Sequence, residues 1–375
     1  MQFRDLRAQY QALKPEIDAG IQAVIDSASF ILGKPVRDLE LELADYVGRK
    51  YCVGVANGTE ALQLSLMALD VGPGDAVFTS DFTYFASAGC ASIIGATPVL
   101  VDIDLDTFNI SPIALEQQIQ RVLREGKLRP RVIIPVDLFG LPANYPEIQA
   151  IAERYGLEIL EDAAQGFGGR IGDRRACSFG KLSATSFFPA KPLGCYGDGG
   201  AIFTDDEMLD ARLRSLRASG KSPEDKYDNR EVGMNSRLDT LQAAILIPKF
   251  HAFRDYELDA VNTVANRYTA ALKGQVTVPT VPEMYLSSWA QYTILLKDRE
   301  QRDRVQSALK EKEIPTMVYY PRGLHQQKAY AWMNLDESAY SNTTEATARV
   351  LSLPMHPYLK EYDQNYVVRA LLEAL

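Results

Sequence analysis

Short apolar segments alternate with segments of helical spacing between residues 51 and 160, and this alternation most constrains the fold. The apolar segments have the length of strands, and helical segments of about 10 to 15 residues separate them. We predict strands at 51–56, 76–79, 98–102, 132–136 and 157–160, with helices at 61–67, 84–94, 112–124 and 144–155. The pattern is typical of an α/β protein whose mostly parallel central sheet is covered by helices on both faces.

Helical patterns also flank this region on both sides. Apolar residues at helical spacing predict one helix within residues 1–30, and a second is predicted from Pro35 to Val47. After about residue 250 a long helix leads into mixed helices and strands, with strands predicted at 291–296 and 316–319. We therefore predict a large domain at 1–250 and a smaller C-terminal α/β domain at 251–375.

The composition excludes several classes of function. A net charge of −9 argues against a nucleic acid or an anionic membrane as the main partner. No window offers the ~20 continuous apolar residues of a membrane span, and the N-terminus lacks an apolar signal core. The four cysteines stand far apart, and the acidic run Asp102–Asp106 lacks the glycine and glutamate of a calcium loop. We expect a cytoplasmic enzyme with reduced thiols and no metal site.

Lys191 is the first candidate for chemistry. It lies among apolar neighbours, between Phe187 and Leu193, and burial of an ammonium group lowers its pKa. The neutral amine is a nucleophile that forms Schiff bases with carbonyl compounds or pyridoxal phosphate. The alternative is an ordinary lysine on a solvated turn. Glycines at 194 and 197 favour the first interpretation, because they mark a backbone that turns tightly or approaches another group closely.

Three polar groups follow predicted strands, where ligands of such sheets bind. Asn57-Gly58-Thr59 begins a helix and either binds a phosphate or only caps that helix. Tyr84 either stacks on a flat cofactor or packs in the core. Asp162 either pairs with a protonated pyridine nitrogen or caps the next turn. One pocket is expected to receive all three groups.

Two further segments are polar and exposed in the predicted fold. Residues 219–230 form a long loop, and such loops are usually functional or mobile. Arg237, which follows it, either clamps a carboxylate or phosphate or belongs to a surface ion pair. His325 lies in a loop, where a neutral histidine with satisfied hydrogen bonds is the alternative to a binding role.

Taken together, the motifs resemble the DegT-type nucleotide-sugar aminotransferases, which depend on pyridoxal phosphate and share the fold of the aspartate aminotransferase superfamily. The resemblance covers nearly the whole chain. It rests on Phe30-Ile-Leu-Gly33, Ala56-Asn-Gly-Thr-Glu-Ala-Leu62, Glu161-Asp-Ala-Ala-Gln165, Ser186-Phe-Phe-Pro-Ala-Lys191, Gly197-Asp-Gly-Gly-Ala201, Asn235-Ser-Arg237 and Leu353-Pro-Met-His356.

The resemblance implies how pyridoxal phosphate would be held. Lys191 would bind it covalently and later move protons between substrate and cofactor. Asp162 would hold the pyridine nitrogen, Tyr84 would stack on the ring, and Gln165 would lie against the ring or its hydroxyl. The residues implied for the phosphate are Gly58, Thr59 and Ser186.

The resemblance also implies a homodimer with shared active sites, because Asn235 matches an asparagine that completes the phosphate site of the neighbouring subunit. The residues that match positions near the sugar nucleotide are Phe30, Arg237, Tyr319, Tyr320 and His325. Relatives that act as sugar dehydratases have histidine in place of Lys191, so amino transfer is favoured. Gln165 replaces a histidine found in many relatives, and we expect it to tune the same reaction.

The implied reaction takes an amino group from L-glutamate, releases 2-oxoglutarate and aminates a keto group on a nucleotide-linked sugar, with ping-pong kinetics. The sequences of the motifs are most similar to those of enzymes acting on UDP-linked 3-keto-N-acetylglucosaminuronate in surface-polysaccharide (O-antigen) synthesis. Alternatives are a 4-keto-6-deoxy sugar substrate, a lyase or dehydratase, and a non-catalytic regulator that binds pyridoxal phosphate. Lys191 disfavours the lyase, and the lack of a basic DNA-binding segment disfavours the regulator.

Overall fold

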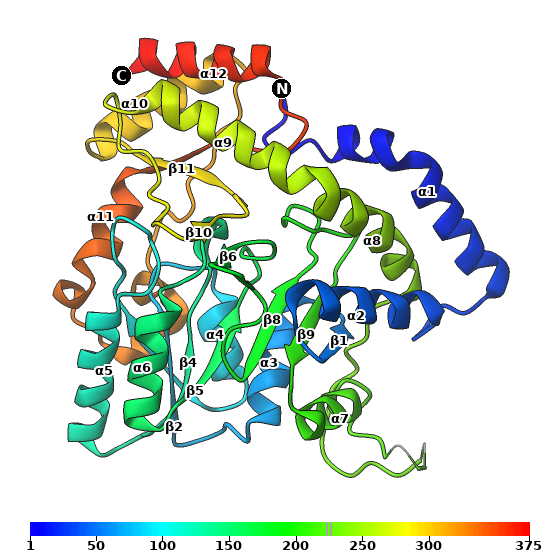
Figure 1. Ribbon diagram of the computed structural model, residues 1–375. Coiled ribbons are helices and arrows are strands. Elements are labelled where there is room, and N and C mark those ends of the chain that lie inside the picture. The colour runs from blue at the N-terminus through cyan, green and yellow to red at the C-terminus, as the bar shows by residue number, and fades with distance from the viewer. Residues whose placement is uncertain (223, 226) are drawn as a thin grey trace.

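The computed structural model describes residues 1–222, 224–225 and 227–375. Within these residues a seven-stranded sheet forms the centre of the molecule (Figure 1), in the order β1-β9-β8-β5-β4-β2-β3. The strands are β1 (Tyr51–Val55), β2 (Asp75–Ser80), β3 (Thr97–Val101), β4 (Arg129–Ile134), β5 (Glu158–Asp162), β8 (Leu182–Ser186) and β9 (Gly200–Thr204). β9 is antiparallel to both neighbours, and the other pairs are parallel, which confirms the predicted mostly parallel sheet.

Helices cover both faces of this sheet. On one face, the helices α3 (Gly58–Ala68), α4 (Ala86–Ile93) and α7 (Glu207–Leu216) share an apolar core with it. On the other face lie α5 (Pro112–Glu125) and α6 (Tyr145–Tyr155), and near β1 also α2 (Lys34–Val47). Because all strands except β9 run in one direction, their carboxyl ends meet at one edge, where ligands of such sheets bind.

The C-terminal part begins with a continuous helical run. It comprises α8 (Thr240–Ala252), a π-helical turn (Phe253–Glu257) and α9 (Leu258–Leu272), so the helix predicted from about residue 250 continues a helix that begins earlier in the chain. The predicted domain boundary falls inside this run, and the division into two domains stays a prediction.

A small antiparallel sheet of β11 (Tyr292–Leu295) and β12 (Val350–Leu353) follows, with α10 (Arg299–Glu311), α11 (Ser341–Arg349) and α12 (Glu361–Ala374). The predicted strand at 316–319 is wrong, because only Met317 pairs there, in an isolated bridge to Ser352. Beyond this bridge the chain turns toward the large sheet, where the ring of Tyr320 packs edge-on against Phe82, two residues past the end of β2, with 5.8 Å between ring centroids.

The N-terminal helix α1 (Leu6–Ser27) extends away from the body and packs along α8 (Figure 1). Short strands β6 (Arg170–Ile171), β7 (Arg174–Arg175) and β10 (Tyr285–Leu286) join a loop of the large sheet to the segment before β11. In the predicted long loop at 219–230, Pro223 and Lys226 lie outside the described residues; the remainder includes a bridge between Lys221 and Asn229.

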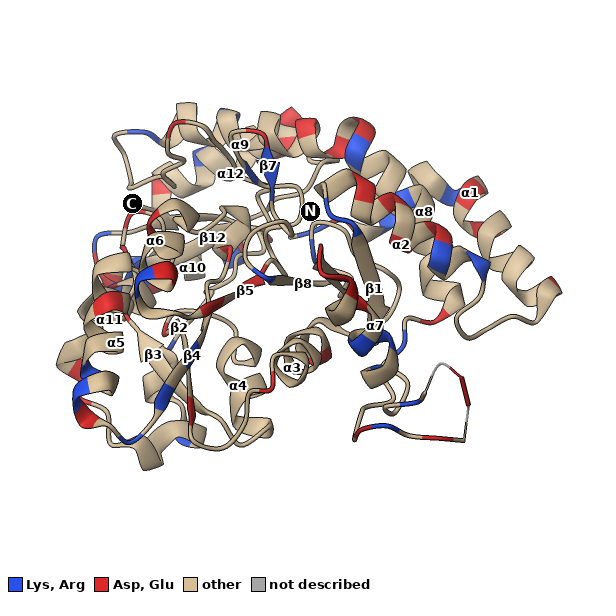
Figure 2. Cartoon of the chain, turned by 60° about the horizontal axis from the view of Figure 1, so that its bottom comes forward, with Lys and Arg blue, Asp and Glu red and all other residues tan. Residues whose placement is uncertain are grey.

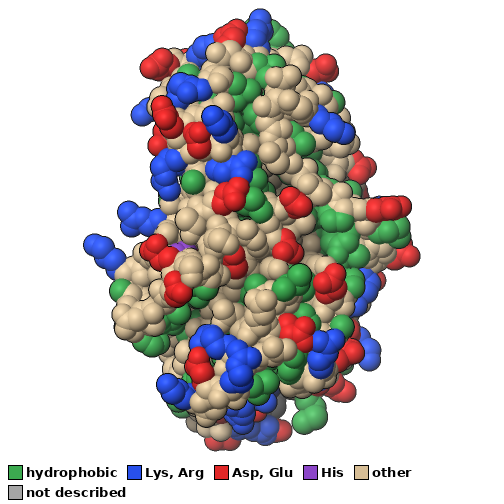
Figure 3. All heavy atoms as spheres, turned by 90° about the vertical axis from the view of Figure 1, so that its left-hand side faces the viewer, with side chains coloured by type: hydrophobic (Ala, Val, Ile, Leu, Met, Phe, Trp, Pro, Cys, Tyr) green, Lys and Arg blue, Asp and Glu red, His purple; other side chains and the backbone are tan. Residues whose placement is uncertain are grey.

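The surface carries both signs of charge. Figure 2 shows basic and acidic residues side by side on α2 and α5, and Figure 3 shows a similar mixture, interspersed with apolar side chains, on one face. This mixture differs from the continuous basic stripe of a nucleic-acid-binding surface. In the described part of the chain, no helix is both long and apolar enough to cross a membrane.

Candidate active site

Lys191 lies in the loop between β8 and β9, which we call the lysine loop. The ends of the loop are tied together, because the Phe187 N–H donates to the Gly199 carbonyl at 2.7 Å. At Gly194, a Cβ atom would lie 2.5 Å from the carbonyl oxygen of Pro189. The backbone therefore passes itself too closely there for another residue, as the glycine pattern predicted.

The Lys191 side chain is half-buried, and burial is the main cause that lowers the pKa of its amine. The carboxylate of Asp162 acts in the opposite direction, and the positive charge of Arg4 adds to the lowering. The direction agrees with the sequence prediction. A lowered pKa increases the fraction of neutral, nucleophilic amine.

Asp162 ends β5 and is buried. Its Oδ2 accepts a hydrogen bond of 2.7 Å from the Ser87 hydroxyl, and its Oδ1 accepts one of 3.2 Å from the Ala164 N–H. Burial raises the pKa of the carboxyl group, while these hydrogen bonds and Lys191 oppose the rise. Ser87 was not predicted from the sequence. Its only signal in the sequence is that it is a polar residue in α4, a helix made mostly of small, apolar residues.

Gln165 connects this group to the C-terminal part. Its Oε1 accepts a hydrogen bond of 2.8 Å from the Phe139 N–H, and its Nε2 donates to the Tyr320 hydroxyl at 3.2 Å. Burial raises the pKa of Tyr320, so its hydroxyl remains protonated at neutral pH. The structure thus brings Tyr320 to Gln165, two predicted site residues 155 positions apart in the chain.

The start of α3 meets the end of β8. Asn57 caps α3, with its Oδ1 accepting from the Glu60 N–H at 2.9 Å. Binding of a phosphate by the same segment stays a prediction. The cap leaves the first N–H groups of the helix, at Gly58 and Thr59, without partners inside the helix. At Gly58, a Cβ atom would lie 2.6 Å from the Cβ of Ser186. Glycine thus lets the N–H groups lie directly beside the Ser186 hydroxyl.

The remaining predicted residues are more exposed. Tyr84 is 58% exposed and Phe30 is 45% exposed. Phe30 accepts a backbone hydrogen bond of 3.0 Å from Thr240, which places it beside the segment that follows Arg237. Arg237 is half-buried and Asn235 is exposed, so their side chains remain available to a ligand or a second subunit.

His325 is placed differently from the expected sugar contact. It forms a buried pair with Asp81, whose oxygens lie 2.7 Å from its backbone nitrogen and 2.6 Å from its Nδ1. Its ring stacks on Tyr340 with 4.5 Å between centroids. Tyr319 contacts the ring edge of Phe3. The geometry therefore favours a structural role for His325, while Tyr319 stays a candidate for the substrate.

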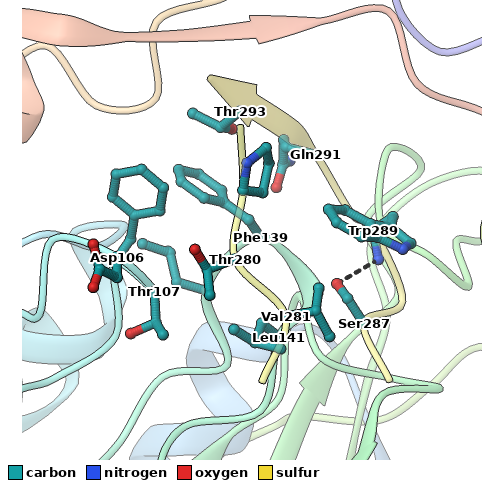
Figure 4. Close-up of a pocket in the computed structure, with 13 residues that line it drawn as sticks. Asp106, Thr107, Phe139, Leu141, Thr280, Val281, Ser287, Trp289, Gln291 and Thr293 are labelled. Carbon is teal, nitrogen blue, oxygen red and sulfur yellow. Dashed lines mark hydrogen bonds between the residues drawn. The ribbon is translucent and has the colours of Figure 1, made fainter. Parts of the chain in front are cut away.

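A small pocket is lined by none of the predicted site residues (Figure 4). Phe139, whose N–H binds Gln165, lines it together with Trp289 and Thr280. Its volume of about 20 Å³ is sufficient for a water molecule and too small for a nucleotide sugar. We therefore place the site at the carboxyl edge of the sheet rather than in this pocket.

A second buried lysine, Lys249 of α8, lies behind the lysine loop. Its Nζ is 4.6 Å from the centroid of the Tyr196 ring, and it has no hydrogen-bond partner among the described residues. Burial lowers the pKa of Lys249 from 10.5 to about 8. At neutral pH the folded protein therefore carries a buried ammonium charge without a hydrogen-bond partner in the described part of the chain, and removal of this charge would stabilise it.

We predict that Lys249→Met stabilises the folded protein at pH 7 by about 3 kcal/mol, since one pKa unit corresponds to roughly 1.4 kcal/mol. Between pH 8 and 10.5 the unfolded wild type binds a proton that the folded form lacks, so its free energy of unfolding rises with pH. The variant's advantage should shrink across this window. Urea unfolding at pH 7 and pH 10 measures it, with exposed Lys50→Met as control. A variant that is less stable at pH 7 would contradict the prediction.

Comparison with known proteins identifies relatives over nearly the whole chain. Residues 11–372 match the DegT/DnrJ/EryC1/StrS aminotransferase family. The chain belongs to this family. It is 46% identical, over 99% of each chain, to UDP-2-acetamido-2-deoxy-3-oxo-D-glucuronate aminotransferase of Pseudomonas aeruginosa. It is also 41% identical to a pleiotropic regulatory protein of Geobacillus stearothermophilus, over 98% of this chain and 97% of that relative.

Solved structures show the same fold. A family aminotransferase from Brucella abortus has a TM-score of 0.96 at 45% identity, covering 99% of this chain and 98% of that one. NtdA of Bacillus subtilis, with bound cofactor PMP (pyridoxamine phosphate), has a TM-score of 0.88 at 28% identity, covering 97% and 82%. The predicted family, fold and enzyme class are confirmed: the chain is an aminotransferase dependent on pyridoxal phosphate. The roles of individual residues stay predictions.

Proposed function

We propose that this aminotransferase moves an amino group from L-glutamate to the keto group of UDP-2-acetamido-2-deoxy-3-oxo-D-glucuronate. The observation that carries the proposal is 46% identity, over nearly the whole length of both chains, to an enzyme named for that substrate. The product would enter surface-polysaccharide (O-antigen) synthesis in the cytoplasm.

The residues present fit pyridoxal phosphate. Asp162 is a buried carboxylate, and its two hydrogen-bond donors, the Ser87 hydroxyl and the Ala164 N–H, are neutral. A protonated pyridine nitrogen would supply the cationic partner that a buried carboxylate requires. The free N–H groups at the start of α3 and the hydroxyls of Thr59 and Ser186 form a cradle suited to a phosphate. Tyr84 and Gln165 would lie against the ring.

Pyridoxal phosphate, when bound, supplies an electron sink for the carbanion formed as the substrate's amino-bearing carbon loses a proton. Lys191 Nζ is the base that accepts this proton and later returns one. Its lowered pKa keeps the neutral amine populated closer to pH 7, where a general base works best. The Tyr320 hydroxyl holds Gln165 in place, and Ser87 holds the Asp162 carboxylate.

The substrate side would be shared between two subunits. Large apolar side chains stay exposed near the site, among them Tyr84, Phe188 and Phe30. A second copy of the chain would cover such a patch. Asn235 of one subunit would complete the phosphate site of the other. Phe30, Arg237, Tyr319 and Tyr320 would then contact the sugar nucleotide; for His325, the buried pair with Asp81 supports only an indirect role.

Arg237 is the proposed partner of the sugar carboxylate. We predict that Arg237→Met raises the KM for the uronate about 10- to 100-fold, because hydrogen bonds to charged groups contribute about 1.5–3 kcal/mol. Turnover of neutral UDP-3-keto-N-acetylglucosamine should change much less. Steady-state kinetics with both sugars test this. Arg237→Lys keeps the charge but loses the planar guanidinium group that binds a carboxylate through two hydrogen bonds, so its KM should lie between those of the wild type and Arg237→Met. Equal losses with both sugars would remove Arg237 from carboxylate recognition.

The reverse reaction tests the proposed substrate, because the amino sugar is more stable than the keto sugar. UDP-2-acetamido-3-amino-2,3-dideoxyglucuronate and 2-oxoglutarate should yield L-glutamate, while a 4-amino-6-deoxy nucleotide sugar should yield much less. Equal turnover of the two sugars would refute the uronate assignment. If neither amino sugar yields L-glutamate from 2-oxoglutarate, the proposed amino donor is wrong.

A further inference from the structure

The N-terminal segment before α1 crosses between the C-terminal part and the lysine loop. The Phe3 carbonyl accepts a hydrogen bond of 3.0 Å from the Met355 N–H, in the loop that leads toward α12 (Figure 1). The Phe3 ring lies edge-on to Tyr319, with 6.3 Å between centroids. Asp5 caps α1 through the Ala8 N–H at 2.8 Å. Arg4, between these two anchors, is therefore held in a fixed place.

The Arg4 side chain reaches the residue that carries the chemistry. Its Nη2 donates to the Lys191 carbonyl at 2.7 Å and lies 3.3 Å from the Pro192 carbonyl. Both acceptors belong to the backbone next to the Lys191 side chain. We propose that Arg4 is a positioning residue for Lys191, fixing the backbone from which the reactive amine extends. The proposal rests on the proposed role of Lys191 as the base.

The lysine loop has a second anchor at its other end. Gln242 of α8 accepts a hydrogen bond of 2.9 Å from the Tyr196 N–H. With Arg4 at Lys191 and Gln242 at Tyr196, the loop is held on both sides of Gly194. Loss of the Arg4 anchor leaves two successive carbonyls at Lys191 and Pro192 without this donor, so the backbone beneath the amine gains freedom.

Arg4 also places a charge near the amine. Two charged groups influence the pKa of Lys191: Asp162 of β5 and Arg4. Glu257, in the π-helical turn, influences the pKa of both Arg4 and Lys249. Burial lowers the pKa of Arg4 to about 10, so its guanidinium remains charged at neutral pH. Its charge lowers the pKa of Lys191, and its removal should therefore raise that pKa.

Arg4→Met tests the proposal, with Arg7→Met as matched control, because Arg7 is exposed on the first turn of α1. We expect Arg4→Met to lower kcat of the amino-donor half-reaction about 10- to 100-fold, with KM for the donor within about twofold, since small misplacement of a reacting group has effects of this size. The acid limb of the pH–rate profile should move to higher pH. Arg4→Lys should recover part of the loss.

A second readout needs neither cofactor nor turnover. In cofactor-free protein, the pH dependence of Lys191 acetylation by acetic anhydride, followed by peptide mass spectrometry, reports the state of the amine. Arg4→Met should need higher pH for the same rate, and Arg7→Met should match wild type. If Arg4→Met lowers only the melting temperature and leaves acetylation unchanged, Arg4 is a tether and the proposal fails. If wild type fails to react with any amino donor, the proposed function fails instead, and acetylation still decides the role of Arg4.

Discussion

Lys191→Ala will abolish amino transfer while leaving the protein folded. The side chain is only half-buried and ends in the site, so its removal leaves the backbone hydrogen bonds of the lysine loop intact. A general base contributes about 10²- to 10⁴-fold to a rate, and this lysine would also be the covalent anchor of the cofactor. We expect kcat to fall by at least about 10³-fold. Stopped-flow absorbance with L-glutamate measures the loss.

Lys191→Arg is the matched variant, because it keeps a cation and a long side chain but has no amine that attacks at neutral pH. It should be as inactive as Lys191→Ala. Borohydride reduction followed by peptide mapping should find the cofactor on residue 191 of the wild type and on neither variant. Cofactor found on Lys249, the other buried lysine, would transfer the role of the base to that residue.

The regular part of the fold is predictable because its signals are local. The strands β1 to β5 and the helices between them lie close to the ranges predicted from apolar period and strand length. Asp162, predicted to follow its strand, is the last residue of β5. The segment 316–319 is not predictable in this way, because Tyr320 is drawn to Phe82 and Gln165 by contacts that sequence periodicity does not contain.

The supporting residues of the site were missed for the same reason. Ser87 is separated from Asp162 by 75 positions and Arg4 from Lys191 by 187, and no local pattern marks either partner. The residues to which we assign chemistry have a signal in the sequence, in their type and in their neighbours. Residues that hold them are ordinary serines and arginines, which become informative only once the chain brings them together.

Asp162→Asn should lower kcat by about 10²- to 10³-fold, the range for removal of one preorganised electrostatic group from an active site. The substitution keeps the size of the side chain. Its amide oxygen accepts from the Ala164 N–H and its NH2 group donates to the Ser87 hydroxyl, but the substitution removes the negative charge that would keep the pyridine nitrogen protonated. The loss should therefore appear in the half-reaction with L-glutamate as well as in the full cycle. The visible spectrum should still show bound cofactor.

Ser87→Ala distinguishes the effect of the negative charge of Asp162 from the effect of the position in which its carboxylate is held. The variant loses one hydrogen bond to the carboxylate, which contributes about 1.5–3 kcal/mol to such a group, so its kcat should fall less than that of Asp162→Asn. If Ser87 acts only by holding Asp162, the double variant should be no slower than Asp162→Asn alone. Additive losses would mean that Ser87 contacts the cofactor itself. A fully active Asp162→Asn would mean that the buried carboxylate only caps its turn.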